Sequence, residues 1–131
     1  EAGGLVAIGT QSLFQNNSGI RNTAIGHGAM YYNVSGGSNT ACGYLALHNS
    51  TGDANAGFGN DALRSNTSGE KNTGLGNEAL EANTTGHSNT AVGHHSLTAN
   101  TTATENCAVG FETMQSTTTG VANTGVGAGA L

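Results

Sequence analysis

The strongest constraint on the fold is a phrase of five residues that returns at an almost fixed interval. NTAVG at residues 89–93 is followed 17 residues later by NCAVG at residues 106–110. Related phrases begin near residues 5, 22, 39, 55, 72, 89, 106 and 123, and every step is 17 residues except one of 16. A period of this kind is typical of repeat proteins, in which each unit contacts only its neighbours. Residues 1–131 are therefore expected to form a single repeat domain.

The consensus of one unit is N-T-A-V-G-x-x-A-L-x-x-N-T-T-G-x-x, and positions are counted from its first residue. Position five is Gly throughout, position four is apolar, position eight is small, and position nine is Leu or Met. Positions four and nine, such as Leu75 and Leu80, are predicted to form the interior stripe. The 16-residue unit, 39–54, matches the consensus with a gap near His48, which indicates a turn that tolerates deletion.

A unit of this length predicts one coil of an all-β parallel β-solenoid, or β-roll, with about eight coils. A helical hairpin is excluded because it needs about 34 residues in the familiar helical repeats. N-T-A-V-G is expected to be one short strand, the residues around A-L a second strand, and N-T-T-G a turn. The position-five glycines are expected to supply a corner with positive φ or a close approach between coils: Gly26, Gly43, Gly59, Gly76, Gly93 and Gly110.

Stacked coils place like residues on like, so two columns of asparagine are predicted to hydrogen-bond along the axis. The first occupies position one: Asn22, Asn39, Asn55, Asn72, Asn89, Asn106 and Asn123. The second occupies position twelve: Asn16, Asn33, Asn49, Asn66, Asn83 and Asn100. The position-twelve residues also stand in N-x-[ST] sequons. These are glycan acceptors in a eukaryotic secretory setting, or a by-product of the turn sequence.

Composition excludes several classes of function. The net charge is −5 with only three Lys and Arg residues, so there is no basic surface for nucleic acid. No apolar run approaches the roughly 18 residues of a membrane span. No signal peptide is visible and the chain begins without Met, which indicates a mature or excised piece. No Cys, His or carboxylate spacing suggests a metal site, and a rod of equal coils offers no cleft for a catalytic carboxylate pair. We expect no cofactor and no enzymatic activity.

The two cysteines lie in different coils. Cys42 is at position four of the third unit and Cys107 at position two of the seventh. Four coils separate them by roughly 19 Å, whereas a disulfide needs Cα atoms within about 7 Å. They cannot pair within the chain, so both are predicted to be small buried hydrophobes, with an intermolecular disulfide as the alternative.

The predicted core is thin, which favours self-association. Burying each of two large apolar residues contributes about 1.5–3 kcal/mol, while ordering each of 17 residues costs about 1–2 kcal/mol. Neither end of the array has a polar cap. A homo-oligomer, most simply a three-chain bundle packed through the small residues at positions three and eight, is therefore expected.

The motif N-T-A-[IV]-G-x-x-A-L-x-x-N-T-T-G resembles the tandem repeats of phage and giant-virus tail-fibre-like proteins and of bacterial surface proteins. More distantly, it is similar to the N-S-V-A-I-G coils in the head domain of trimeric autotransporter adhesins, a left-handed parallel β-roll made by three chains. The resemblance extends from Leu5 to Leu131. It implies a non-enzymatic structural or adhesive segment of an extracellular, cell-surface or virion fibre, either a rigid spacer or a receptor-binding head.

Two candidate surfaces suggest more specific functions. A Ser and Thr ladder at positions thirteen and fourteen resembles the outward Thr arrays of solenoidal antifreeze proteins, so ice binding on one flat face is the alternative function. It comprises Ser50, Thr51, Thr67, Ser68, Thr84, Thr85, Thr101, Thr102, Thr118 and Thr119. Aromatic residues Phe14, Tyr31 and Tyr32 gather in the first two units. They are a possible carbohydrate patch, or an interface that lacks its neighbour.

Overall fold

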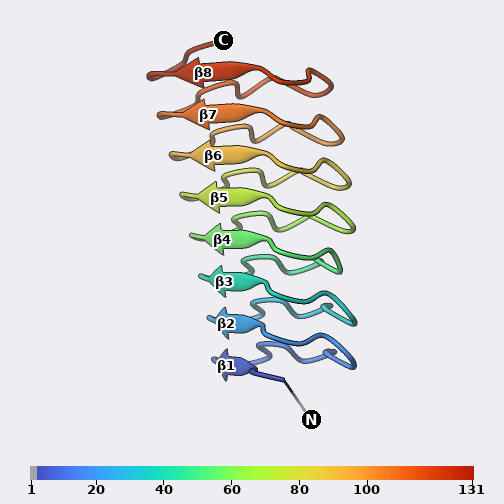
Figure 1. Ribbon diagram of the computed structural model, residues 1–131. Coiled ribbons are helices and arrows are strands. Elements are labelled where there is room, and N and C mark those ends of the chain that lie inside the picture. Colours follow the sequence, from blue (N-terminus) through green and yellow to red (C-terminus); the bar gives the residue numbers. More distant parts are fainter. Residues whose placement is uncertain (1–2) are drawn as a thin grey trace.

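The computed structural model describes residues 3–131, and in this range the chain forms eight three-residue strands (Figure 1). They are β1 (Val6–Ile8), β2 (Thr23–Ile25), β3 (Thr40–Cys42), β4 (Ala56–Phe58), β5 (Thr73–Leu75), β6 (Thr90–Val92), β7 (Cys107–Val109) and β8 (Thr124–Val126). Each strand spans positions two to four of its unit. The remaining residues of each unit form turns and bends, so the second strand expected around A-L is wrong.

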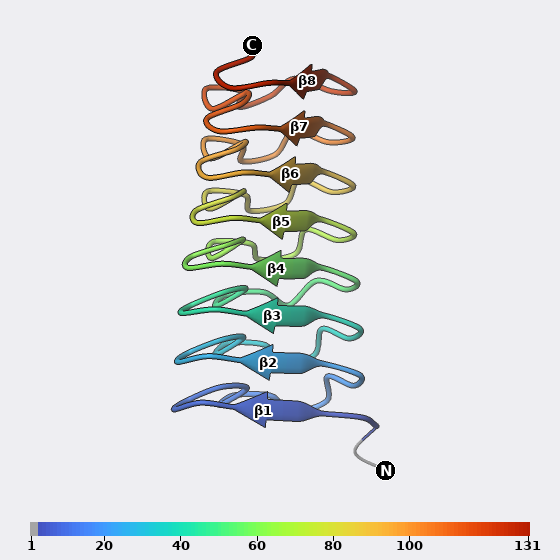
Figure 2. The same ribbon diagram turned by 90° about the vertical axis from the view of Figure 1, so that its left-hand side faces the viewer.

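All eight strands form one parallel sheet in chain order, which confirms the all-β parallel β-solenoid (Figure 2). The register places like on like, as in Thr73 opposite Thr90 and Leu75 opposite Val92. Backbone hydrogen bonds between coils continue outside the strands, for example from Leu80 N to Ser96 O at 3.1 Å. Coils are therefore joined around most of their circumference, which allows a regular stack from very short strands.

The interior is built from positions three, eight and nine. Successive side chains of a strand point to opposite faces, so the middle residue of each strand points inward, as Ala91 does, and from β2 to β8 it is buried. The position-nine residues are also buried: Leu13, Met30, Leu47, Leu63, Leu80, Leu97 and Met114. Position four is not interior, because it lies one residue from the buried middle position. Leu75, for instance, is 48% exposed.

The position-one asparagines form the predicted ladder inside the coil. The backbone N–H of each next asparagine donates to the preceding side-chain oxygen, as Asn89 N does to Asn72 Oδ1 at 3.0 Å. The same side chain spans its own coil, since Asn72 Nδ2 donates to Gly86 O at 2.8 Å. Because the amides of Asn72 and Asn89 are 0% exposed, these bonds satisfy groups that would otherwise be costly to bury.

The second asparagine ladder is present, but Ser50 takes the place that was expected for Asn49. Asn83 Nδ2 donates to Asn66 Oδ1 at 2.7 Å, but Asn66 Nδ2 donates to Ser50 Oγ at 3.0 Å rather than to Asn49. The residue missing from the 16-residue unit is therefore at position fourteen, between Thr51 and the next glycine, and not near His48. Ser50 is buried as a ladder residue, whereas Asn49 occupies position eleven and is half-buried.

Left-handed backbone conformations recur at positions five, seven, nine and seventeen. Gly76 at position five has φ of 140°, and a Cβ there would lie 2.5 Å from Gly93 O. The other three positions are mostly not glycine, as with Glu78, Leu80 and Lys71, whose φ values are 56°, 56° and 57°. At all four positions the N–H donates to a neighbouring coil. The left-handed turn therefore serves to point the amide along the axis, and this bond offsets the strain.

Two further expectations, that the cysteines are buried and that the small residues pack between chains, are wrong. Cys42 and Cys107 occupy the outer positions of their strands, so Cys42 is exposed and Cys107 half-buried, and neither belongs to the core. From the second to the seventh coil, the small residues at positions three and eight, such as Ala91 and Ala79, are already buried within a single chain. They are therefore not available for contact between chains.

Candidate interaction surfaces

The charged side chains of residues 3–131 form a few local pairs. Arg64 contacts Asp61 at 3.6 Å and Glu81 at 3.2 Å, and His95 Nε2 lies 2.8 Å from Glu78. Within the same range, no three His, Cys, Asp or Glu side chains are placed to hold one metal ion. These side chains are exposed or half-buried. Arg64 forms surface ion pairs within and between coils, and His95 lies at hydrogen-bonding distance from Glu78 of the preceding coil.

The threonine ladder lies at a turn, and part of it is engaged internally. The position-thirteen hydroxyls of Thr51, Thr67 and Thr84 each donate to the carbonyl at position thirteen of the next coil, at 3.0–3.1 Å. The position-fourteen side chains, such as Thr85 and Thr102, are exposed. Ser50 is buried and leaves this ladder. The outward array therefore consists of one column of free hydroxyls beside one column whose hydroxyls bond along the axis.

The aromatic residues of the first three coils form a continuous stack. Phe14 and Tyr31 stack with ring centroids 5.1 Å apart, and Tyr31 stacks on His48 at 5.3 Å. Tyr32 meets Tyr31 edge to face at 4.5 Å. Since both faces of Tyr31 are covered by its neighbours, the stack offers ring edges to a ligand. Phe14, at 64% exposed, has the most free surface.

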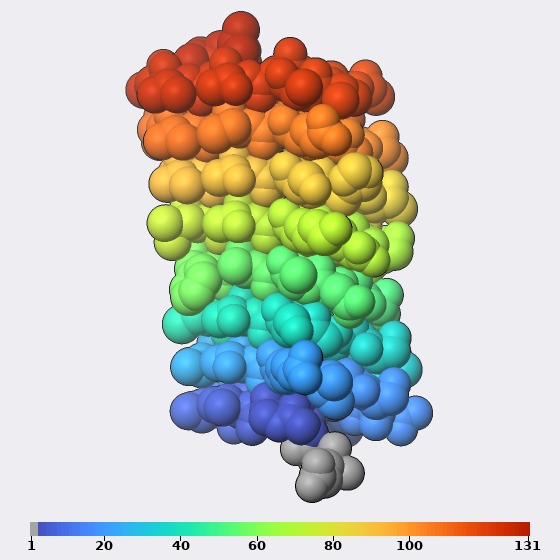
Figure 3. Space-filling view, in the orientation of Figure 1, coloured from blue at the N-terminus to red at the C-terminus, as the bar shows by residue number. Residues whose placement is uncertain are grey.

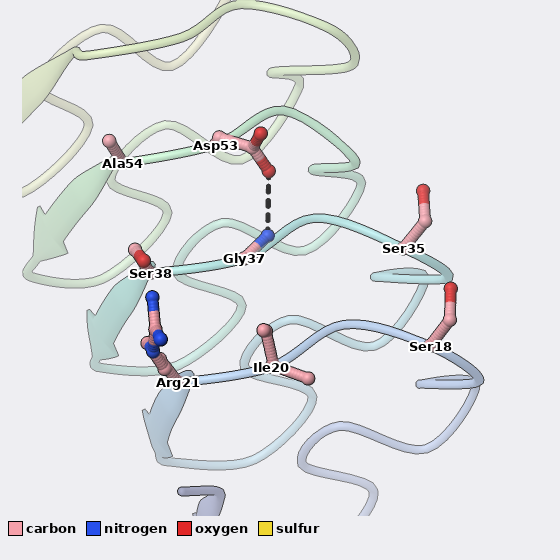
Figure 4. Close-up of a pocket in the computed structure, with 8 residues that line it drawn as sticks. All are labelled: Ser18, Ile20, Arg21, Ser35, Gly37, Ser38, Asp53 and Ala54. Atoms are coloured by element: carbon pink, nitrogen blue, oxygen red, sulfur yellow. Dashed lines mark hydrogen bonds between the residues drawn. The ribbon is translucent and has the colours of Figure 1, made fainter. Parts of the chain in front are cut away.

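An open hollow of about 380 Å³ lies across the first three coils, lined by residues at positions fourteen, sixteen and seventeen (Figure 4). Ile20, Gly37 and Asp53 occupy position sixteen of successive coils. The hollow forms because Gly37 has no side chain to fill the space between the other two. Arg21, Asp53 and three serine hydroxyls lie around it, and Gly37 N donates to Asp53 Oδ1 at 2.7 Å. These side chains are exposed, so the hollow is a shallow polar groove rather than an enclosed site.

The outer face of the sheet carries an unbroken apolar column, which we call the position-four stripe. It contains Ile8, Ile25, Cys42, Phe58, Leu75, Val92, Val109 and Val126. Six of these eight are large hydrophobic residues that are 37–70% exposed, and the other two are Cys42 and the half-buried Val92. The repeat pattern alone does not distinguish this surface from the interior, because a column of apolar residues occurs on both faces of these strands. Alternation around the small middle residue of each strand, which is Ala or Gly, is the signal that identifies it.

The face around the stripe has no formal charge. Positions two, four and six of the eight coils contain no Asp, Glu, Lys or Arg, and the charged residues after Glu1 all fall at positions seven, ten, sixteen and seventeen. Figure 2 views the molecule from the side on which the strands lie. The space-filling view shows bands of similar width, one for each coil (Figure 3). The sheet face is therefore a long, neutral, regular surface.

Comparisons with protein-family models, with curated proteins and with solved structures give no match. Residues 3–131 contain no helix that has the length and hydropathy needed to cross a membrane.

Proposed function

We propose that the chain is a non-enzymatic structural segment of an extracellular, cell-surface or virion fibre, acting as a rigid spacer or a surface-binding head and assembled from three copies. The observation that carries the proposal is the translational regularity of the stack. Every strand meets the next in the same parallel register, backbone bonds join the coils outside the strands, and the position-one asparagine ladder runs from Asn22 to Asn123. Such a rod extends in equal steps and holds its two ends at a fixed separation, which is the physical task of a spacer.

Self-association is supported by the surface rather than by the interior. A single chain already buries its small residues, yet it leaves the position-four stripe in water. Contiguous apolar patches of roughly 300–600 Å² are the largest found on ordinary monomers and often mark interaction sites. Binding to a carbohydrate at the Phe14, Tyr31 and Tyr32 stack is compatible with a surface-binding head, since its ring edges remain exposed.

Ice binding is the second candidate function, and the exposed column at position fourteen favours it. Thr85, Thr102 and Thr119 present hydroxyl and methyl groups on successive coils, with a spacing of about 4.8 Å set by strand pairing. The position-thirteen column weakens this candidate, because hydroxyls that donate to the next coil, such as that of Thr84, cannot also donate to water. We therefore rank it second.

Duplication of one repeat tests the spacer function. A variant with residues 72–88 inserted a second time is expected to fold and to lengthen the particle by about 4.8 Å, measured by small-angle X-ray scattering. Loss of folding, or an unchanged maximum dimension, contradicts a modular rod. Thermal hysteresis measured on the same wild-type sample is expected to be absent. Faceted ice crystals that disappear when Thr85 and Thr102 are replaced by Tyr establish the second function instead.

A further inference from the structure

We infer that a second copy of this chain covers the position-four stripe, with both sheets running in the same direction and like coil facing like coil. The inference rests on the proposed function and adds the surface, the direction and the register of assembly. The route expected from the sequence, through positions three and eight, is closed because those residues are interior. The stripe is on the opposite side of the same strands.

The size of the face agrees with a protein interface. Eight strands spaced about 4.8 Å apart extend for about 34 Å, and positions two to six add a width of about 15 Å with their side chains, so the face is on the order of 500 Å². A standard interface buries about 800 Å² on each partner. Two such faces bury about 1,000 Å² in total, which is the lower limit expected of a specific interface.

Charge and periodicity select the occupant. Two copies each carry a net charge of −5, so they repel through most of their surfaces, but the sheet face has no charged side chain and allows approach. A charged partner finds nothing to pair with here. The apolar side chains recur once per coil along the whole face, and a protein without this repeat cannot oppose each of them. A second copy has the same spacing by construction.

The sequence of side chain sizes favours the parallel arrangement. The largest member, Phe58, is next to the smallest, Cys42, in adjacent strands β4 and β3. When like coils face each other, the Cys42 side chains of the two copies leave space between them. The Phe58 rings of the adjacent coil can fill this space. This arrangement also continues without interruption if further coils are added at either end, whereas antiparallel chains match only over one fixed length.

Cys42 reports the register directly. Packed sheets are about 10 Å apart, beyond the roughly 7 Å Cα separation that a disulfide bridges, so facing Cys42 thiols stay free but lie close. In an antiparallel pair, the third coil faces the sixth, and the two thiols are offset by about 14 Å along the axis. Cys107 is at position two, towards one edge of the face, so in the parallel pair its thiols are farther apart than those of Cys42.

The experiment uses a short bifunctional maleimide on two single-cysteine variants. Cys107→Ser, which keeps Cys42, is expected to yield a covalent dimer on a denaturing gel. Cys42→Ser, which keeps Cys107, is expected to yield several-fold less. Equal yields from the two variants, or no product from Cys107→Ser in a sample that sediments as an oligomer, overturn the inferred surface and register while leaving the proposed fibre segment intact. A wild-type monomer overturns both.

A charge at the stripe provides the second test. Leu75→Asp is expected to keep the circular dichroism spectrum of the wild type and to shift the sedimenting species to a monomer. Val34→Asp is the matched control, because Val34 is 42% exposed but lies in the turn at position thirteen, away from the sheet. It is expected to remain associated. If Leu75→Asp stays associated, or if both variants dissociate equally, the stripe is not the interface.

Discussion

Removing one amide from the position-twelve ladder tests how the coils are held together. Asn83 is fully buried, and its side chain makes three hydrogen bonds. Asn83 Nδ2 donates to Asn66 Oδ1 at 2.7 Å and to Gly86 O at 3.0 Å, and its Oδ1 accepts from Asn100 Nδ2 at 2.7 Å. The variant Asn83→Ala removes all three bonds without introducing a charge.

The expected cost follows from what each former partner retains. Gly86 O keeps the bond from Asn72 Nδ2 at 2.8 Å, so it stays satisfied. Asn66 Oδ1 loses its side-chain donor, and Asn100 Nδ2 keeps only a longer bond of 3.3 Å to Ala103 O. One buried oxygen and one of the two N–H groups of Asn100 Nδ2 thus lose a partner, at about 1–3 kcal/mol each, so Asn83→Ala is expected to lower the free energy of unfolding by about 2–6 kcal/mol.

Asn83→Ser is expected to lower the free energy of unfolding by less than Asn83→Ala does, because the chain already contains a serine in this ladder. Ser50 occupies the same position in the third coil and still accepts from Asn66 Nδ2 at 3.0 Å. Ser50 is too short to donate to the amide of the preceding coil, so Asn33 Oδ1 has no partner among the described residues. Only one buried group is lost, so the cost is expected to be about 1–3 kcal/mol.

Urea unfolding followed by circular dichroism measures the series, with Asn49→Ala as the control. Asn49 is half-buried at position eleven, and a substitution away from the ladder is expected to change the free energy of unfolding by less than about 0.5 kcal/mol. The expected order of destabilisation is Asn83→Ala, then Asn83→Ser, then Asn49→Ala. The reasoning is refuted if Asn83→Ala unfolds at the same urea concentration as Asn49→Ala.

Three further predictions concern the interior, the backbone and the broken ladder. Leu80→Asp is expected to abolish folding, because an unpaired buried charge costs several kcal/mol, while Leu75→Asp keeps the native circular dichroism spectrum; the opposite pattern contradicts the assignment of the two positions. Lys71→Gly is expected to raise the free energy of unfolding by about 1 kcal/mol, since glycine relieves a left-handed conformation that costs other residues about 1–2 kcal/mol; Lys71→Ala should give no gain in the same urea titration. Asn100 Oδ1 has no hydrogen-bond partner within the described residues. The double change Ala103→Gly and Thr117→Asn is expected to supply a donor for this oxygen and to raise the free energy of unfolding by about 1 kcal/mol. An unchanged urea midpoint counts against this account of the ladder.

The coil architecture could be predicted from the sequence because the repeat constrains it at every unit. A 17-residue period, invariant Gly at position five and two asparagine columns all require like to stack on like. The direction of the strand side chains was harder. An apolar residue at position four was assumed to be buried, but exposed apolar residues are common on folded proteins. The inward amide of Asn72 and alternation along Thr73, Gly74 and Leu75 place Leu75 outside.

The gap in the third unit shows a different limit. Matching letters aligned Asn49 with the other asparagines, but backbone closure decides which residue faces inward, and the shortened turn places Ser50 there. The left-handed backbone at Leu80 is equally invisible in sequence, because leucine rarely adopts it. It is stable here because the N–H of Leu80 finds Ser96 O in the next coil at 3.1 Å. Such long-range compensation cannot be seen in a single unit.

Sedimentation equilibrium of the unmodified chain tests the central claim most directly, namely that this rod works as an assembled fibre segment. One chain has a mass of 12.9 kDa. At micromolar concentration we predict a stable species with three times that mass. A single species of 12.9 kDa that persists as the concentration is raised contradicts the claim.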